Sequence, residues 1–132
     1  MELKRASEVC ESISQLLDKR LYRMRRLYFA CQSYTQGSLS KEILEKQLQD
    51  YDEVLYEWND RLNLNLALIG TYFGQLAHAY LNSIYTYFKN TGSELEDAYR
   101  AVSQNPNANY HFQSFSGNLI CLIGKCMDWV RL

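Results

Sequence analysis

The stretch that decides the fold is LKRASEVCESISQLLDKRLYRMRRLYFACQSY, residues 3–34. Its apolar and semi-apolar residues recur at alternating steps of three and four, which is the heptad spacing of a helix packed against other helices. Only Arg20 interrupts this seam. The spacing predicts one helix over about residues 3–35, with a length of about 45 Å at 1.5 Å per residue. The seam consists of Leu3, Ala6, Cys10, Ile13, Leu17, Met24, Leu27, Cys31 and Tyr34.

Turn and cap signals divide the rest of the chain into further helices. Ser40 is suited to be the N-cap of a second helix, because its hydroxyl can accept a hydrogen bond from a backbone N–H of the first turn. Gly70 and Gly74 mark the turn that follows. The sequence NPNAN at residues 105–109 contains the only proline and is the clearest loop. The expected helices cover residues 3–35, 40–69, 74–90 with 94–104, and 110–131.

The third helix carries a signal for a break. Asn90, Thr91 and Gly92 weaken the helical pattern, and Ser93 with Glu96 has the spacing of a capping box at a new helix start. We therefore expect this helix to be kinked or split near residues 90–93. Short connections between long helices favour antiparallel neighbours. The predicted fold is all-α, an antiparallel four-helix bundle in a single domain over residues 1–132.

The composition narrows the class of protein. Six glycines and one proline in 132 residues are too few for a turn-rich all-β fold or for a disordered chain. Charged residues flank every short apolar group of residues 1–17, so the apolar core of a secretion signal is missing and we expect a cytoplasmic protein. Residues 62–88 are uncharged, but polar side chains in nearly every turn argue against a membrane span. A cytosolic domain of a membrane-anchored protein, with its basic residues near lipid headgroups, stays an alternative.

Five positive charges fall within residues 19–26, which we call the basic run, although the chain has a formal net charge of only −1. Five acidic residues fall within residues 50–60 of the second predicted helix. In an antiparallel hairpin these two runs face each other, so the basic run is expected to be neutralised internally. That lowers its capacity to bind phosphates. The expected neighbours are Arg25 with Asp50, Arg23 with Asp52, and Lys19 with Tyr56, one residue from Glu57.

Two sets of residues are candidate surfaces. The candidate basic surface consists of Lys19, Arg20, Arg23 and Arg26, and it would serve a nucleic-acid-binding protein, a disfavoured alternative. Arg20 is its uncertain member, because its place on the seam demands Glu57 or a buried acceptor. The candidate polar surface lies on the third helix and consists of His78, Asn82, Tyr85 and Lys89. The inward, apolar face of that helix is instead expected to consist of Leu76, Tyr80, Ile84, Tyr87 and Phe88.

Catalytic residues, metal ligands and cofactors are not expected. Histidine is the commonest general base, but His78 and His111 occur in no recognisable catalytic motif. A small helical nuclease or toxin that uses either histidine with Arg100 stays the enzymatic alternative. The spacing of the four cysteines is that of neither a CxxC pair nor a zinc site. We therefore expect them to be free thiols packed as small apolar side chains.

The distribution of charge gives the best indication of function. Residues 1–61 hold 21 of the 29 charged side chains, which leaves eight for the 71 residues from 62 onward. A monomeric bundle must show a polar face of every helix to water, so a charge-poor half indicates additional burial. The sequence therefore predicts a non-enzymatic helical interaction or scaffold module. Its charge-poor second half would mediate homo-oligomer formation or dock a protein partner.

Overall fold

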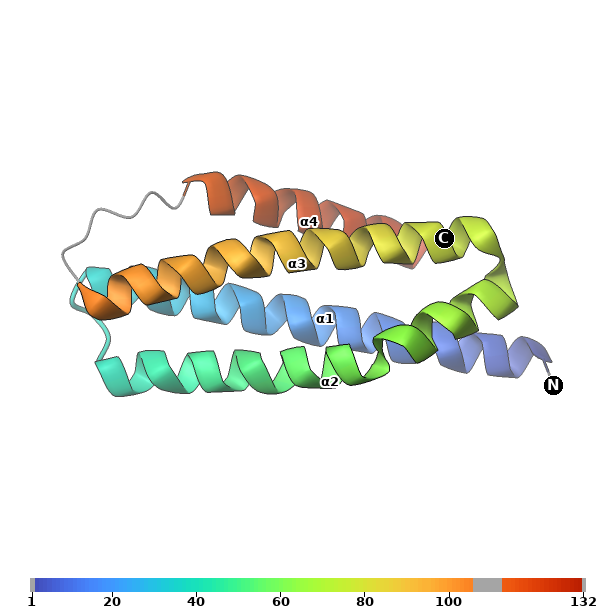
Figure 1. Cartoon of the computed structure of the whole chain (residues 1–132), viewed down its shortest axis with the longest axis horizontal. Helices are drawn as coiled ribbons and strands as arrows, with labels where there is room; N and C mark the ends of the chain where they lie inside the picture. The colour runs from blue at the N-terminus through green and yellow to red at the C-terminus, as the bar shows by residue number, and fades with distance from the viewer. Residues whose placement is uncertain (1, 106–112, 132) are drawn as a thin grey trace.

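The computed structural model describes residues 2–105 and 113–131, which form four long α-helices (Figure 1). The helices are α1 (Glu2–Thr35), α2 (Lys41–Phe73), α3 (Gln75–Gln104) and α4 (Gln113–Arg131). Helices adjacent in the chain run in opposite directions, and the described residues form no β-strand. The prediction of an all-α, antiparallel four-helix bundle is therefore confirmed. The expected start of the last helix at residue 110 lies outside the described residues.

Two of the four helices form the centre of the bundle. α1 contacts all three other helices, and α3 does the same. Over the described parts of the chain, α2 and α4 do not contact each other, and in Figure 1 they lie on opposite sides of the α1–α3 pair. This arrangement leaves an outer face on α4 and an opening between α2 and α3, and both bear on function.

The turns form at the residues predicted from the sequence, except that Gly70 does not lie in a turn. The Ser40 hydroxyl accepts a hydrogen bond from the N–H of Ile43 at 3.3 Å, as expected of an N-cap. α2 does not stop at residue 69 but continues through Gly70 to Phe73. Gly74 alone makes the turn into α3, with φ of 90°, a region of backbone conformation that side chains rarely tolerate. Only one of the two glycines therefore serves the turn.

α3 is a single helix from residue 75 to residue 104, so the expected split near residues 90–93 is wrong. The reason is tertiary packing. Gly92 is buried, and a Cβ atom placed on it would lie 2.6 Å from the Tyr51 hydroxyl of α2. Gly92 thus permits a close approach of two helices instead of ending one. The segment also joins α3 to α4, because the Glu94 carboxylate accepts hydrogen bonds from Asn118 of α4 at 2.8 and 2.9 Å.

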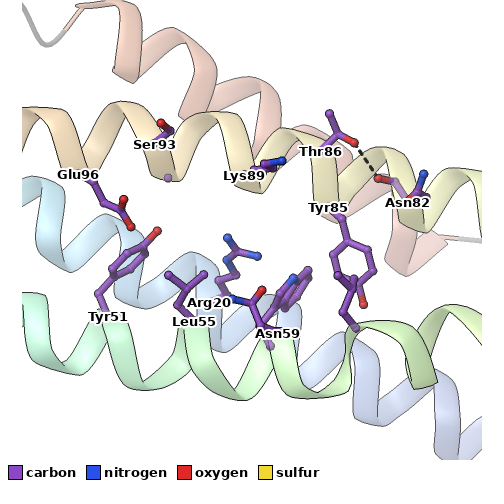
Figure 2. Close-up of a pocket in the computed structure, with 13 residues that line it drawn as sticks. Arg20, Tyr51, Leu55, Asn59, Asn82, Tyr85, Thr86, Lys89, Ser93 and Glu96 are labelled. Atoms are coloured by element: carbon purple, nitrogen blue, oxygen red, sulfur yellow. Dashed lines mark hydrogen bonds between the residues drawn. The ribbon is translucent and has the colours of Figure 1, made fainter.

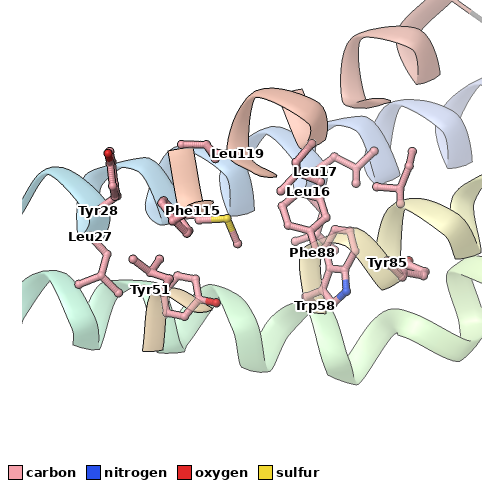
Figure 3. Packing of buried hydrophobic residues seen from close by; sticks show 14 of the residues in the cluster. Leu16, Leu17, Leu27, Tyr28, Tyr51, Trp58, Tyr85, Phe88, Phe115 and Leu119 are labelled. Atoms are coloured by element: carbon pink, nitrogen blue, oxygen red, sulfur yellow. The ribbon is translucent and has the colours of Figure 1, made fainter. Parts of the chain in front are cut away.

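The core contains layers of aliphatic and aromatic side chains from all four helices (Figure 3). Tyr28 and Phe115 pack with ring centres 4.7 Å apart and join α1 to α4. Trp58 of α2 contacts Phe88 of α3, with ring centres 5.1 Å apart. Each large apolar side chain buried in this way stabilises the fold by about 1.5–3 kcal/mol. The expected seam of α1 is buried from Ile13 to Cys31, whereas Ala6, Cys10 and Tyr34 are half-buried and Leu3 is 86% exposed.

Candidate functional site

The basic run is divided between the α1–α2 interface, the core and solvent. Lys19 Nζ lies 3.0 Å from Glu57 Oε2, as the hairpin register predicts. Asp50, however, pairs with Arg23 at 3.6 Å and not with Arg25, so that part of the prediction is wrong. Arg25 is exposed, because two residues along a helix rotate a side chain by about 200°, away from α2.

Arg20 lies inside the bundle, with its side chain only 4% exposed. Its guanidinium carbon lies 4.7 Å from the centre of the Trp58 ring and 4.6 Å from that of Phe88, within the range of cation–π attraction. Burial lowers the pKa of the Arg20 guanidinium, and the neighbouring Tyr51 opposes that shift. Arginine nevertheless stays charged in proteins. Over the described residues, no carboxylate oxygen lies within 4.0 Å of its nitrogens.

Arg20 forms part of the wall of a pocket of about 500 Å³ between α2 and α3 (Figure 2). Figure 2 shows its guanidinium projecting from α1 into the space between those two helices. One wall comes from α2 and the other from α3. The polar and aromatic lining residues are Tyr51, Trp58 and Asn59 on α2, and Asn82, Tyr85, Thr86, Lys89, Ser93 and Glu96 on α3.

The candidate polar surface is only partly assembled. Asn82, Tyr85 and Lys89 line the pocket together, so the structure joins three of its four residues to Arg20 of the candidate basic surface. His78 lies apart, half-buried near the α2–α3 turn with its side chain against Gly70. Tyr85 does not lie on an open polar surface, because it is 7% exposed and its ring packs edge-on against Trp58.

The face of α3 that enters the core agrees only in part with the expected one. Ile84 and Phe88 are buried as expected. Tyr87 is 39% exposed and Leu76 is 89% exposed, although both were expected to point inward. Leu81 and Tyr85 are buried in their place. Tyr80 does pack inward, because its ring stacks on Trp129 of α4 and its hydroxyl donates to the Lys125 carbonyl at 3.2 Å.

Two ionisable residues of the pocket were not identified from the sequence. Burial raises the pKa of the Tyr51 hydroxyl and that of the Glu96 carboxyl, and for Glu96 the nearby Asp52 raises it further. Figure 2 shows the Glu96 carboxylate beside the Tyr51 hydroxyl. The sequence did contain one signal for this site, which is an arginine on an apolar seam. That signal called for Glu57 or a buried acceptor as the partner of Arg20, and Glu57 pairs with Lys19 instead.

The candidate basic surface is not continuous. Arg20 is buried, and Lys19 and Arg23 pair with acids of α2. Arg26 is exposed and contributes to a shallow hollow with Phe29 and Ile43 near the α1–α2 turn. The basic run therefore presents few uncompensated charges to a phosphate backbone, whose recognition depends on several such contacts.

A second feature is the outer face of α4, formed by Gly117, Ile120, Cys121, Gly124, Met127 and Asp128. These residues follow helical spacing and are all exposed. Ile120 is 68% and Met127 53% exposed, and Asp128 supplies the only charge in the set. A Cβ atom placed on Gly117 or on Gly124 would have no atom within 4 Å. This face belongs to the charge-poor half of the chain.

Catalytic and metal-binding groups do not converge in the described structure. His111 lies outside the described residues, and Arg100 is paired with Asp97 at 3.4 Å. Within residues 2–105 and 113–131, no group of three His, Cys, Asp or Glu side chains is placed to hold a metal ion. Among those same residues, no helix combines the length and apolar character needed to cross a membrane.

The four cysteines are free thiols. Cys31 is buried, and burial raises the pKa of its thiol to about 12. Cys126 is half-buried, and burial raises the pKa of its thiol to about 11. Both values keep these thiols protonated and unreactive at neutral pH. Cys121 differs from them because it is exposed.

Comparison with known proteins yields no match to a family model, to a curated protein or to a solved structure. The functional argument therefore depends on the pocket between α2 and α3 and on the outer face of α4.

Proposed function

We propose that this protein is a non-enzymatic helical interaction module that self-associates through the outer face of α4. The observation that carries the proposal is the exposure of Ile120 and Met127, 68% and 53%, on a helix face with a single charge. Exposed apolar surface of this kind is uncommon on a stable monomer and is typical of an interaction site. A second copy of the chain is the partner that we infer.

The small residues of this face favour a second copy of α4 as the occupant. Gly117 and Gly124 are seven residues apart and have no atoms within 4 Å of their Cβ positions, so another helix can approach closely there. In an antiparallel pair of α4 helices, Gly117 of one copy comes level with Gly124 of the other, and Ile120 comes level with Cys121. A two-fold axis requires such a self-complementary surface. The face carries one charged residue, Asp128, so dimer formation would desolvate few charges.

We also propose a cytoplasmic location. The support is the free state of all four cysteines, since a reducing compartment keeps thiols unpaired.

Light scattering coupled to size exclusion, recorded over a dilution series, tests the self-association. The wild-type chain is expected at twice its mass of 15.5 kDa and is expected to dissociate on dilution. Ile120→Glu would bury a carboxylate without a partner in the dimer, which costs several kcal/mol, so this variant is expected to stay monomeric.

Tyr56→Glu is the matched control, because Tyr56 lies on α2 and is 67% exposed, against 68% for Ile120. It is expected to dimerise as the wild type does. A wild-type chain that is monomeric at all concentrations would overturn the proposal, and so would equal loss of the dimer in both variants. In that case the partners to examine next would be another protein or a nucleic acid.

A further inference from the structure

We propose that the pocket between α2 and α3 binds a small organic anion, whose phosphate or carboxylate group lies between the guanidinium of Arg20 and the ammonium of Lys89. This proposal is independent of self-association, because none of the residues of the outer face of α4 lines the pocket.

The first argument is the uncompensated charge of Arg20. A buried charge is costly unless it is paired and hydrogen-bonded. Lys19, Arg23 and Lys46 each lie within 4.0 Å of a carboxylate oxygen, although all of them are more exposed than Arg20. Arg20 has no such partner among the described residues, and its buried Nε has no hydrogen-bond partner either. An anion in the pocket would supply the missing negative charge at the Nη atoms.

The second argument is the convergence of donors at one point of the wall. Tyr51 Oη and Arg20 Nη2 lie 2.6 and 3.9 Å from the position that a Cβ atom of residue 92 would occupy. Gly92, Tyr51 and Arg20 all line the pocket, so the two polar groups lie close together in its wall. A hydroxyl and a guanidinium so arranged can both donate to one oxyanion, and arginine matches the planar geometry of carboxylate and phosphate oxygens.

A third argument concerns the other charges of the pocket. Lys89 is exposed at its rim and, in the described structure, has no carboxylate oxygen within 4.0 Å. Glu96 lies beside Tyr51 and is the one acidic residue of the pocket lining. Arg20 and Lys89 outweigh Glu96, which leaves the pocket with a net positive charge.

The size and lining of the pocket indicate an organic ligand instead of a bare ion. A volume of about 500 Å³ lies within the range of pockets for small molecules, about 300–1,000 Å³. Leu55, Leu62 and the Trp58 ring supply apolar and aromatic surface on the same wall. A flat or apolar body could contact these side chains while its anionic group contacts Arg20.

The test is a titration of the ¹⁵N-labelled full chain followed by NMR, at constant ionic strength, with phenyl phosphate, benzoate and inorganic phosphate as separate probes. Saturable shifts of the backbone amides of Asn59, Tyr85, Lys89 and Gly92 with phenyl phosphate or benzoate would support the proposal. Saturation by phenyl phosphate alone assigns a phosphate ligand, and saturation by benzoate alone assigns a carboxylate. Inorganic phosphate reports how much of the affinity comes from the anionic group.

Variants separate the site from general charge effects. Lys89→Glu is expected to weaken binding at least tenfold, whereas Lys4→Glu makes the same change of net charge outside the pocket and is expected to leave affinity unchanged. Arg20→Met is expected to abolish binding, and Lys89→Glu keeps the test decisive if that variant does not fold. Lack of saturable shifts with all three probes would overturn the proposal, as would equal weakening by the Lys89 and Lys4 variants.

Discussion

The guanidinium carbon of Arg20 lies 4.6 Å from the centre of the Phe88 ring, so a cation occupies a layer of the core that an aliphatic side chain would otherwise fill. The centre of the Trp58 ring lies 4.7 Å from the same carbon and 5.1 Å from the centre of the Phe88 ring, so the two aromatic rings contact each other beside the cation. Cation–π attraction contributes about 0.5–2 kcal/mol for a ring at such a distance, whereas the desolvation of a buried charge costs several kcal/mol. The free protein is therefore less stable than it would be with an apolar residue at position 20.

Replacement of Arg20 by methionine is expected to maintain or increase stability. Methionine fills a similar volume against Trp58 and Phe88 without a charge, and comparable replacements of buried ionic groups are neutral or stabilising by about 1–4 kcal/mol. Arg20→Ala leaves a cavity and is expected to lose about 2–5 kcal/mol. The free energies of unfolding in urea distinguish the two. A methionine variant as unstable as the alanine variant would mean that the charge itself stabilises the core.

Replacement of Gly92 by alanine is expected to cost about 1–3 kcal/mol, because the new methyl group overlaps the buried Tyr51 hydroxyl. The contact would be 2.6 Å. Removal of that hydroxyl by Tyr51→Phe should restore part of the loss, which a double-mutant cycle measures as a coupling energy. Gly117→Ala is the control, since its methyl group meets no atom within 4 Å. Measured on the monomer, it should gain about 1 kcal/mol from helix propensity. Additive effects of the Gly92 and Tyr51 substitutions would contradict the packing described here.

Helix number and the α1–α2 pairing could be predicted from the sequence because both depend on local periodicity and on the sign of charges. The face of α3 could be predicted only in part. Its apolar residues fit two neighbouring phases, one with Tyr80 and Tyr87 inward and one with Leu81 and Tyr85 inward. Thr91 and Gly92 decide between them, because they are small enough for close approach to α2, and a hydrophobicity pattern gives such residues no weight.

Only some of the pocket residues could be predicted from the sequence, for a related reason. Arg20 could be recognised as unusual from its position, because a charge on an apolar seam requires a partner. Its neighbours Trp58 and Phe88 come from two other helices, 38 and 68 residues further along the chain, and only tertiary packing brings them together. The three residues of the candidate polar surface that reach the pocket share its α3 wall, so helical spacing was sufficient to group them.

Gly74 and Gly70 are expected to respond oppositely to replacement by alanine. Gly74 has φ of 90°, and a side chain forced into such a conformation costs about 1–3 kcal/mol. Gly70 is helical, and a methyl group there meets His78 at 3.5 Å, an ordinary contact, so Gly70→Ala should be neutral or stabilising. Thermal unfolding of both variants provides the comparison. Equal destabilisation would place Gly70 in the turn, as the sequence alone suggested.

Glu96→Gln is expected to stabilise the protein at neutral pH. Burial and the nearby Asp52 raise the pKa of Glu96 in the folded state, so the folded state holds the proton more tightly than the unfolded state does. Ionised Glu96 therefore lowers stability above its folded pKa, and the effect disappears below the unfolded pKa of about 4.3, where both states are protonated. The difference in unfolding free energy between Glu96→Gln and wild type should be positive at pH 7 and close to zero near pH 3 (about one unit below that value). Asp97→Asn, at an exposed position paired with Arg100, should show no such gain.

Cross-linking at Cys121 tests the geometry of the proposed dimer. In an antiparallel α4 pair with Gly117 level with Gly124 of the other copy, the two Cys121 residues are offset by one residue, about 1.5 Å along the helix axis. A short bismaleimide should therefore join two chains, whereas Cys121→Ser should remain uncross-linked. Cys10→Ser is the control, since it removes a half-buried thiol away from this face and should cross-link as the wild type does. Denaturing gel electrophoresis gives the readout. A wild-type dimer in solution that cross-links through Cys10 and not through Cys121 would mean that self-association uses a surface other than the outer face of α4.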